Sequence, residues 1–420
     1  MTLKARIKRR INMIKKYLGF KVLLPHIFKK YSKKPIDEKL VVFADIRDRA
    51  MPENFIGLWE LCEKNGYKCV EHSGRVFGKD CPENKRYKAK FKYKCDFMKL
   101  YARAKAVFLV EAFDMAYVAG PRPGTQLVQL WHACGLMKNM GYSAPAKSWG
   151  ISEKDKKMYP MHNNYTLASV SSERVRYGYH KAFQCDFNTI KAIGSPRTDI
   201  YYDETFKANA KKEVLKLFPN IGDRKIVLYA PTFRGKSIPK SFLPRFIDYD
   251  VFNEALSDKY AFVVKFHPLM AQGKLSEADR LTNQGFLFDA TDKLTPEVAL
   301  CAADILITDF SSIMFEYMLL ERPLISFIPD IDEYAGGRGF FDKYDKLAPG
   351  PYVVTQEKLL EAILNVDDWF DKERVRKYKK RFMSACDGHS TERIYNYVFD
   401  PEFREEYDRK VLPYNPKKYE

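Results

Sequence analysis

The stretch Ala303-Asp-Ile-Leu-Ile-Thr-Asp-Phe-Ser-Ser312 decides the fold, because an apolar run typical of a buried strand ends in a polar turn. The residues after that turn, about 311–321, have the pattern of a helix. Strands that alternate with helices form parallel sheets with helices on their faces. This stretch therefore predicts an α/β protein whose polar turn lies at the carboxyl end of a parallel strand.

The same alternation continues on both sides of this stretch. Strands are predicted at 39–44, 68–70, 106–110, 125–130, 165–170, 189–193, 225–230, 261–266, 323–328 and 352–355, and helices near 53–65, 204–217 and 356–366. The turn-rich residues 220–224 separate two such series. We therefore predict two doubly wound parallel-sheet domains, with a ligand cleft where the strand ends of both domains meet.

The length of 420 residues, with 46% hydrophobic composition, also favours two domains, since one compact core rarely grows so large. The predicted segments are a leader over 1–35, domains over 36–200 and 201–400, and a polar, irregular tail over 401–420. The eight cysteines form no C-x-x-C pair, and no apolar run approaches the ~18 residues of a membrane-spanning helix. These features predict a chain in a reducing cytosol, without a zinc site, that touches a membrane rather than crossing it.

The net charge of +18 lies mostly in the leader. Residues 1–34 hold twelve of the 72 basic residues and none of the 54 acidic ones, which leaves 60 basic against 54 acidic residues elsewhere. Such a block suits an anionic membrane or a phosphate backbone, or is a solvated leader. Because the rest of the chain is nearly balanced and has no recognised nucleic-acid motif, nucleic acid is not an expected partner.

The leader also has a helical pattern. Ile7, Ile11, Ile14 and Leu18 recur at helical spacing, and the basic residues lie mostly on the other face. This is typical of an amphipathic helix in a lipid interface, so we expect a peripheral protein on an anionic membrane surface. The alternative is a helix packed on the protein's own surface.

A second basic cluster lies at Lys88, Lys90, Lys92 and Lys94, which alternate with mostly aromatic residues. In an extended segment this alternation places the ammonium groups on one face and the rings on the other. The segment is then either an edge strand guarded by lysines or a site for a polyanionic acceptor.

Ser311 and Ser312 lie at the predicted start of a helix, where free backbone N–H groups and the helix dipole favour phosphate. Serine is also a common N-cap, so this pattern alone leaves both roles open. Glu316, one turn further on, is either a ligand for ribose hydroxyls or an exposed helical residue.

Two more strand ends of the second domain carry phosphate-compatible groups. His267 directly follows the strand at 261–266, and Thr232 and Arg234 follow the strand at 225–230. An imidazole there can bind phosphate or move a proton, and a guanidinium suits a diphosphate. Three convergent strand ends therefore predict a phosphate-binding site.

In the first domain, His132 follows the strand at 125–130 and precedes a loop that contains Gly135. A histidine at this position is either structural or a general base that faces the second domain across the cleft. Arg197 and Asp199 belong to a turn that closes the first domain and orients the hinge.

In their order, these motifs resemble the CDP-glycerol glycerophosphotransferase family, which builds teichoic acids and related polyol-phosphate polymers. The matching strings are Trp131-His132-Ala133, Gly194 to Asp199, Ala230 to Arg234, His267-Pro268, Thr308 to Ser312, Arg338-Gly-Phe340, Ala348 to Pro351 and Asp387-Gly388 with Glu392-Arg393. Ala133 replaces the family's usual glycine and Phe310 its usual tyrosine. The variant around His132 leaves the choice between glycerol and ribitol donors open.

The resemblance implies a GT-B-like fold and an enzyme in which an acceptor hydroxyl attacks the β-phosphorus of CDP-glycerol and expels CMP. It implies His132 as the base and His267 as a ligand of the donor phosphate, with no obligatory cofactor or metal. The substrate-binding residues that it implies are Gly135, Thr232, Arg234, Asp309, Ser311, Ser312, Glu316 and Arg338.

The implied partners are a CDP-polyol donor, a lipid-linked saccharide or polyol-phosphate acceptor, and the anionic cytoplasmic face of the bacterial cell membrane. Two alternatives within the enzymes stay open: a CDP-ribitol ribitolphosphotransferase, and a GT-B glycosyltransferase that uses a nucleotide-sugar donor in capsule assembly.

Overall fold

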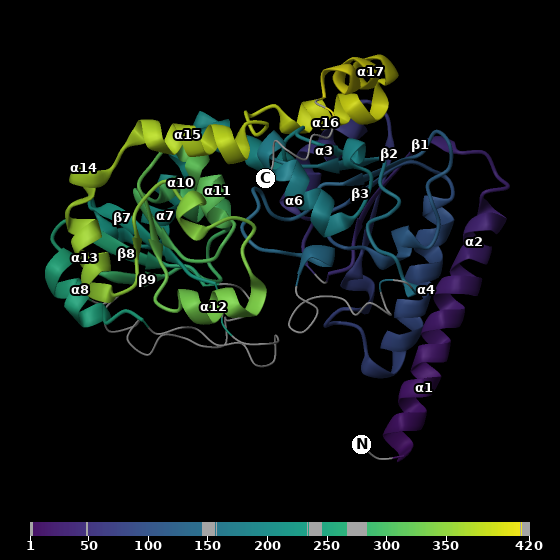
Figure 1. Ribbon diagram of the computed structural model, residues 1–420, viewed down its shortest axis with the longest axis horizontal. Helices are drawn as coiled ribbons and strands as arrows, with labels where there is room; N and C mark the ends of the chain where they lie inside the picture. The colour runs from purple at the N-terminus through teal and green to yellow at the C-terminus, as the bar shows by residue number, and fades with distance from the viewer. Residues whose placement is uncertain are drawn as a thin grey trace.

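Two parallel sheets of six strands each form the two halves of the computed structural model (Figure 1). The structure describes residues 3–47, 49–144, 156, 158–232, 234, 246–266, 284–411 and 413. Every strand pair in both sheets is parallel. The predicted α/β class with two doubly wound sheets is therefore confirmed.

The first sheet has the strand order β2-β1-β3-β4-β5-β6. Its elements are β1 (Asp37–Asp45), α3 (Glu53–Lys64), β2 (Lys68–Ser73), α4 (Glu83–Tyr101), β3 (Ala104–Leu109), β4 (Gln126–Gln129), β5 (Leu167–Ser169), α6 (Glu173–Phe183) and β6 (Ile190–Lys191). Side chains alternate along β1, so Val41 and Phe43 face α3, whereas Val42 and Ala44 face the core that includes α4. Burial on both faces explains why these strands are continuous apolar runs in the sequence.

The second sheet has the strand order β12-β11-β10-β7-β8-β9. Its elements are α7 (Glu204–Leu217), β7 (Lys225–Ala230), α8 (Tyr249–Leu256), β8 (Tyr260–Val264), β9 (Leu287–Asp289), α10 (Pro296–Ala302), β10 (Ile305–Thr308), α11 (Ile313–Tyr317), β11 (Leu324–Phe327), α12 (Ile331–Arg338), β12 (Tyr352–Val353), α13 (Gln356–Leu364) and α14 (Val366–Trp369). Read from its other edge, this is the order of a dinucleotide-binding sheet, with a topological switch point between β7 and β10.

The C-terminal helices connect the two halves. They are α15 (Lys372–Met383), α16 (Ser390–Phe399) and α17 (Pro401–Lys410), and Figure 1 shows them as a yellow band that runs from the second half to the first. Ile394 and Val398 of α16 belong to the same core cluster as Val41 of β1. The chain therefore returns to the first sheet before it ends.

The prediction of an irregular segment after residue 401 is wrong for 401–410, which form α17. Asp400 caps this helix by accepting hydrogen bonds from the Glu402 and Phe403 N–H groups, at 2.9 and 3.1 Å. Pro401 occupies the first helical position, where it has no N–H to leave unpaired. These local signals outweigh the polar composition of the segment.

The extended conformation considered for Lys88 to Lys94 is also wrong, because these residues lie in the middle of α4. Tyr93, Phe97 and Tyr101 are buried at intervals of four residues, which is a helical period. The alternation of lysine and aromatic residues is therefore not a strand pattern here.

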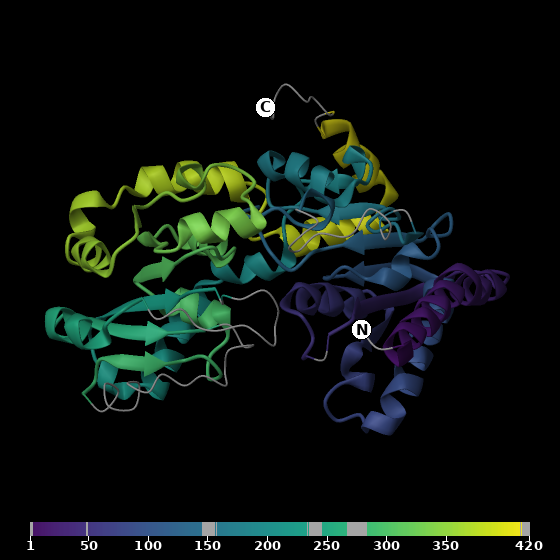
Figure 2. The same ribbon diagram turned by 60° about the horizontal axis from the view of Figure 1, so that its bottom comes forward.

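The leader is helical from α1 (Leu3–Leu18) through a π-helical turn, Gly19–Leu23, to α2 (Leu24–Tyr31). Both ribbon views show it running alongside α4 at the edge of the first half (Figures 1 and 2). Leu24 is buried and the Phe28 ring packs on Tyr101 with centroids 5.1 Å apart, so α2 is part of the fold. Within the described residues, no helix is both long and apolar enough to cross a membrane.

Candidate active site

Two of the predicted donor-site residues meet at the switch point of the second sheet. Thr232 follows β7 and Asp309 follows β10, and these strands are neighbours. The Asp309 Oδ1 atom accepts hydrogen bonds from the Thr232 N–H at 2.9 Å and from its hydroxyl at 3.0 Å. Ligands of such sheets bind outside the carboxyl ends of the strands at this point, so the predicted cluster has the expected location.

Arg234 is also at this edge, but two carboxylates already occupy its guanidinium. Its Nη1 atom lies 2.8 Å from Asp309 Oδ2, and its Nε and Nη2 atoms lie 2.5 and 2.9 Å from Asp330. Burial lowers the pKa of Arg234, but these carboxylates raise it more, so the group stays charged. Arg234 therefore orders the turn around Asp309, and its predicted contact with a diphosphate stays a prediction.

Ser311 and Ser312 lie half-buried at the start of α11, next to Asp309. The Ser311 hydroxyl accepts a long hydrogen bond of 3.4 Å from the Ile313 N–H. Ser312 occupies the N-cap position without making a side-chain cap. Neither serine therefore makes a strong N-cap hydrogen bond, and both hydroxyls remain suited to a phosphate.

Glu316 lies away from solvent, in the joint between the two halves, rather than exposed on its helix. Its Oε2 atom accepts hydrogen bonds from Arg197 Nη2 at 3.1 Å and from the Tyr201 hydroxyl at 3.0 Å. Arg197 Nη2 also lies 3.0 Å from Glu297 Oε1. Burial raises the pKa of Glu316, and the charge of Arg197 opposes that rise. The Glu316 carboxylate is thus used in contacts between the two halves and is not available to a ribose hydroxyl.

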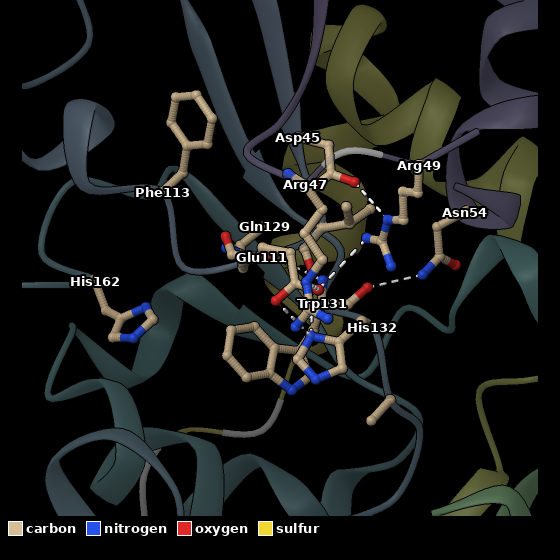
Figure 3. A network of polar contacts seen from close by, with 12 residues as sticks. Asp45, Arg47, Arg49, Asn54, Glu111, Phe113, Gln129, Trp131, His132 and His162 are labelled. Carbon is tan, nitrogen blue, oxygen red and sulfur yellow. Dashed lines mark hydrogen bonds and ion pairs between the residues drawn. The ribbon is translucent and has the colours of Figure 1, made fainter. Parts of the chain in front are cut away.

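His132 lies in a tightly held loop after β4, within the polar network drawn in Figure 3. Trp131 precedes it with a φ of 59°, a left-handed conformation that is strained for a bulky residue. Two amide side chains hold Trp131 there: Gln129 Oε1 accepts from its N–H at 2.9 Å, and Asn54 Nδ2 donates to its carbonyl at 2.8 Å. These two hydrogen bonds hold the backbone of Trp131 and so fix the position of the next residue, His132.

The His132 imidazole is paired with a carboxylate. Its Nδ1 atom lies 3.3 Å from Glu111 Oε2, and the imidazole side chain is 39% exposed against 9% for Glu111. Burial alone raises the pKa of Glu111, but the contact with His132 and the charges of Arg47 and Arg49 bring it below its usual value. Glu111 thus stays ionised and orients His132, which leaves Nε2 as the ring nitrogen for a substrate proton.

Sequence reasoning missed the acidic and basic residues around this histidine. Arg47 Nε lies 2.8 Å from Glu111 Oε1, and Arg49 Nε lies 2.6 Å from Asp45 Oδ2. Asp45 ends β1 and Glu111 follows β3, and these neighbouring strands flank the switch point of the first sheet. Carboxylates directly after two predicted strands were the signal that could have identified them.

The His132 loop touches the second half of the molecule directly. Gly135 has a φ of +61°, and a Cβ atom there would lie 2.3 Å from the Phe315 ring of α11. Lys138 pairs with Phe340 in an antiparallel bridge, and Arg197 Nη1 donates to the His132 carbonyl at 3.1 Å. Gly135 therefore allows close packing here, and its predicted substrate contact stays a prediction.

Two predicted residues cannot be placed in this geometry. His267 lies outside the described residues. Arg338 is the last residue of α12, and its side chain lies outside the description. Among the described residues, no group of three or more His, Cys, Asp or Glu side chains is arranged to hold a metal ion.

Comparison with known proteins gives a consistent family. The model of the family described as CDP-glycerol:poly(glycerophosphate) glycerophosphotransferase matches residues 26–400. The chain is 33% identical over 314 residues to a teichoic acid poly(ribitol-phosphate) polymerase of Bacillus spizizenii, covering 74% of this chain and 49% of the relative. It is 30% identical to a teichoic acid ribitol-phosphate primase of the same organism, covering 87% and 92%.

The fold has a match among solved structures. The wall teichoic acid polymerase TagF superposes with a TM-score of 0.70 at 20% identity, over 97% of this chain and all of that one. This likeness supports the GT-B-like arrangement of two parallel-sheet halves. The chain spans about half the length of the polymerase it matches at 33% identity and nearly all of the primase.

Proposed function

The chain belongs to the CDP-glycerol:poly(glycerophosphate) glycerophosphotransferase family, and we propose that it moves a polyol phosphate from a CDP-polyol to an acceptor hydroxyl in teichoic acid synthesis, releasing CMP. One observation carries the proposal. An oriented histidine, His132, lies at the strand ends of one sheet, and a phosphate-compatible turn, Asp309 to Ser312, lies at the switch point of the other. The loop that carries His132 packs on helix α11, which follows the phosphate-compatible turn.

In the proposed reaction, His132 Nε2 takes the proton of the acceptor hydroxyl. The acceptor oxygen forms a bond to the β-phosphorus of the donor, and the bond between that phosphorus and the CMP oxygen breaks. Glu111 stabilises the imidazolium that forms and fixes the ring orientation. The negative charge of Glu111 is itself balanced by Arg47 and Arg49.

For the donor, we propose that Ser311 and Ser312 bind phosphate oxygens with their hydroxyls and backbone N–H groups. Thr232 and Asp309 hold the neighbouring turn in place. On the basis of the family resemblance, we also propose His267 as a ligand of the donor phosphate and Arg338 as a substrate-binding residue.

The donor is a CDP-polyol, and CDP-ribitol is the one we expect to be used best. Relatives named for ribitol phosphate are 28–33% identical to the chain, and those named for glycerol phosphate are 26–28% identical. We expect CMP release from CDP-ribitol to have a higher kcat/KM than release from CDP-glycerol, measured with the full chain and a lipid-linked polyol-phosphate acceptor. Release of a nucleoside diphosphate from a nucleotide sugar, with no CMP from either CDP-polyol, would instead support the glycosyltransferase.

We also propose that the leader binds the membrane that carries the acceptor. Ile11, Ile14 and Leu18 of α1 are 46%, 56% and 51% exposed, so about half of this apolar stripe is left open by the residues that the structure describes. Replacing all three with serine is expected to weaken sedimentation with anionic vesicles at least tenfold, because their insertion contributes to the free energy of binding. Vesicle sedimentation at constant salt measures this effect.

The matched control removes equally exposed apolar side chains elsewhere. It replaces, also with serine, residues that are 46%, 45% and 49% exposed: Ile56, Val251 and Leu364. We expect this variant to sediment like the original chain. Equal losses in both triple variants would remove the leader from the membrane contact.

A further inference from the structure

A cavity of about 420 Å³ lies between the leader and the first half of the molecule. Its volume is in the range of about 300–1,000 Å³ that is usual for small-molecule sites. Residues that line it include Lys16, Phe20 and Lys21 of the leader and Asp114, Tyr117 and Tyr159 opposite. The cavity is therefore bounded by a helix with an exposed apolar stripe on one side and by the body of the fold on the other.

The charges at the cavity favour an anion. Lys16 Nζ lies 4.2 Å from the centre of the Tyr159 ring, and Lys21 is a second exposed ammonium group on the rim. Among the described lining residues, the one carboxylate is that of Asp114, and Lys94 Nζ lies 3.6 Å from its Oδ2 atom. Positive charge thus exceeds negative charge around the opening, as a phosphate requires.

Asp114 also has an unused acceptor. Its Oδ1 atom is covered, yet it has no hydrogen-bond partner among the described residues. A covered carboxylate oxygen without a donor is costly, so a ligand hydroxyl beside the phosphate would stabilise it. The polar end of the cavity therefore suits a head group that carries both phosphate and hydroxyl.

The rest of the lining is apolar, from Phe20 and Pro25 of the leader to Val118, Met158 and Met161. A lining that combines apolar side chains with two lysines matches an amphiphile with one charged end. We propose that this cavity binds a single phosphate-bearing lipid, with its head group at Lys16, Lys21 and Asp114 and its chain against the apolar wall. This proposal goes beyond the transfer reaction.

The cavity wall is coupled to the loop of His132 by hydrogen bonds. The Tyr117 hydroxyl lies 2.8 Å from the Tyr165 hydroxyl, and Gln129 Nε2 donates to Tyr165 at 2.9 Å. Gln129 Oε1 in turn accepts from the Trp131 N–H. A lipid in the cavity would therefore rest on the same buried network that holds the proposed base.

The test is calorimetry with the full chain and two amphiphiles below their micelle concentrations, decyl phosphate and dihexanoyl phosphatidylglycerol. Both carry a phosphate and short apolar chains, and the second adds head-group hydroxyls for Asp114. Tighter binding of phosphatidylglycerol supports the whole proposal and a bilayer lipid as the source. Equal or tighter binding of decyl phosphate supports the lipid-phosphate site, with a lipid phosphate such as an acceptor carrier as the source, and overturns the contact proposed between Asp114 and a hydroxyl. No binding of either, or equally tight binding of inorganic phosphate, would overturn the proposal.

Variants localise the binding. Lys16→Gln with Lys21→Gln is expected to weaken it at least tenfold, and Val118→Phe, which fills the cavity without a change of charge, by a similar factor. The matched control, Lys15→Gln with Lys29→Gln, removes two leader lysines that do not line the cavity and should change affinity less than threefold. Equal losses in both lysine pairs, or normal binding by Val118→Phe, contradict the proposal. Affinity for CDP-ribitol should stay unchanged throughout, which separates this result from the fate of the proposed reaction.

Discussion

Replacing His132 with alanine is expected to lower the rate of CMP release by about 10²- to 10⁴-fold, while affinity for the CDP-polyol stays nearly unchanged. The proposed base acts on the acceptor proton and not on the donor, so its loss raises the barrier without removing donor contacts. Turnover is measured as CMP release at saturating donor, and donor affinity by calorimetry on the same preparation. Full turnover in His132→Ala would exclude this histidine as the base.

Two further variants sharpen the result. Glu111→Gln keeps the shape of the partner but removes the charge that stabilises a protonated His132, so it should also slow turnover with little change in donor affinity.

The double variant Ser311→Ala, Ser312→Ala should instead weaken donor binding, by about 1–3 kcal/mol if each lost hydrogen bond has a usual value. Ser384→Ala, at an exposed helix end, is the matched control for hydroxyl loss.

The pH dependence of the His132 and Glu111 pair has a definite sign. Because the pKa of Glu111 is below its usual value in the folded chain, its ionised form is favoured by folding. The stability it contributes is present above the usual carboxylate pKa and is lost as the pH falls through the lower, folded value. Acid should therefore disorder this pair only below the pH at which an ordinary glutamate is protonated.

The strands could be predicted from sequence because burial on both faces makes each of them a short apolar run. Lys225–Ala230 is predicted and observed with the same limits, and β10 falls inside the predicted stretch. Helix α4 could not be predicted in this way, since its buried face is aromatic while lysines lie between those residues. The position of α16 on the first sheet depends on a core cluster that joins residues about 350 apart, such as Val41 and Ile394, which periodicity does not reveal.

The candidate site was predictable only where a residue directly follows a strand. That rule predicted that Thr232 and Asp309 lie close together, as they do, and that His132 lies at the edge of the first sheet. It gave no information on the partners of these residues, so Glu111 was missed and Glu316 was expected either to bind ribose hydroxyls or to be exposed. Whether a helical glutamate faces solvent or a buried arginine depends on how the two halves pack. Local patterns in a single sequence do not predict that packing.

Arg197→Met is expected to destabilise the folded chain by about 3–5 kcal/mol at neutral pH, because it leaves Glu297 and Glu316 buried without a counter-charge. Burial already raises the pKa of Glu316, and Arg197→Met removes the charge that opposes that rise. A carboxyl with a raised folded pKa favours the folded state at low pH and disfavours it as the pH rises through that value. The loss measured by urea unfolding should therefore be smaller at pH 5 than at pH 8.

The matched control is Arg376→Met, which also removes an arginine between two glutamates, Glu321 and Glu373, but on the surface. Water screens those carboxylates, so we expect little change in the free energy of unfolding at either pH. Equal effects of the two variants would contradict a buried joint. Because Arg197 also donates to the His132 carbonyl, its loss should slow CMP release even in the protein that remains folded, and Arg376→Met should not. A destabilised Arg197→Met protein with normal turnover would show that the joint stabilises the fold without positioning the proposed base.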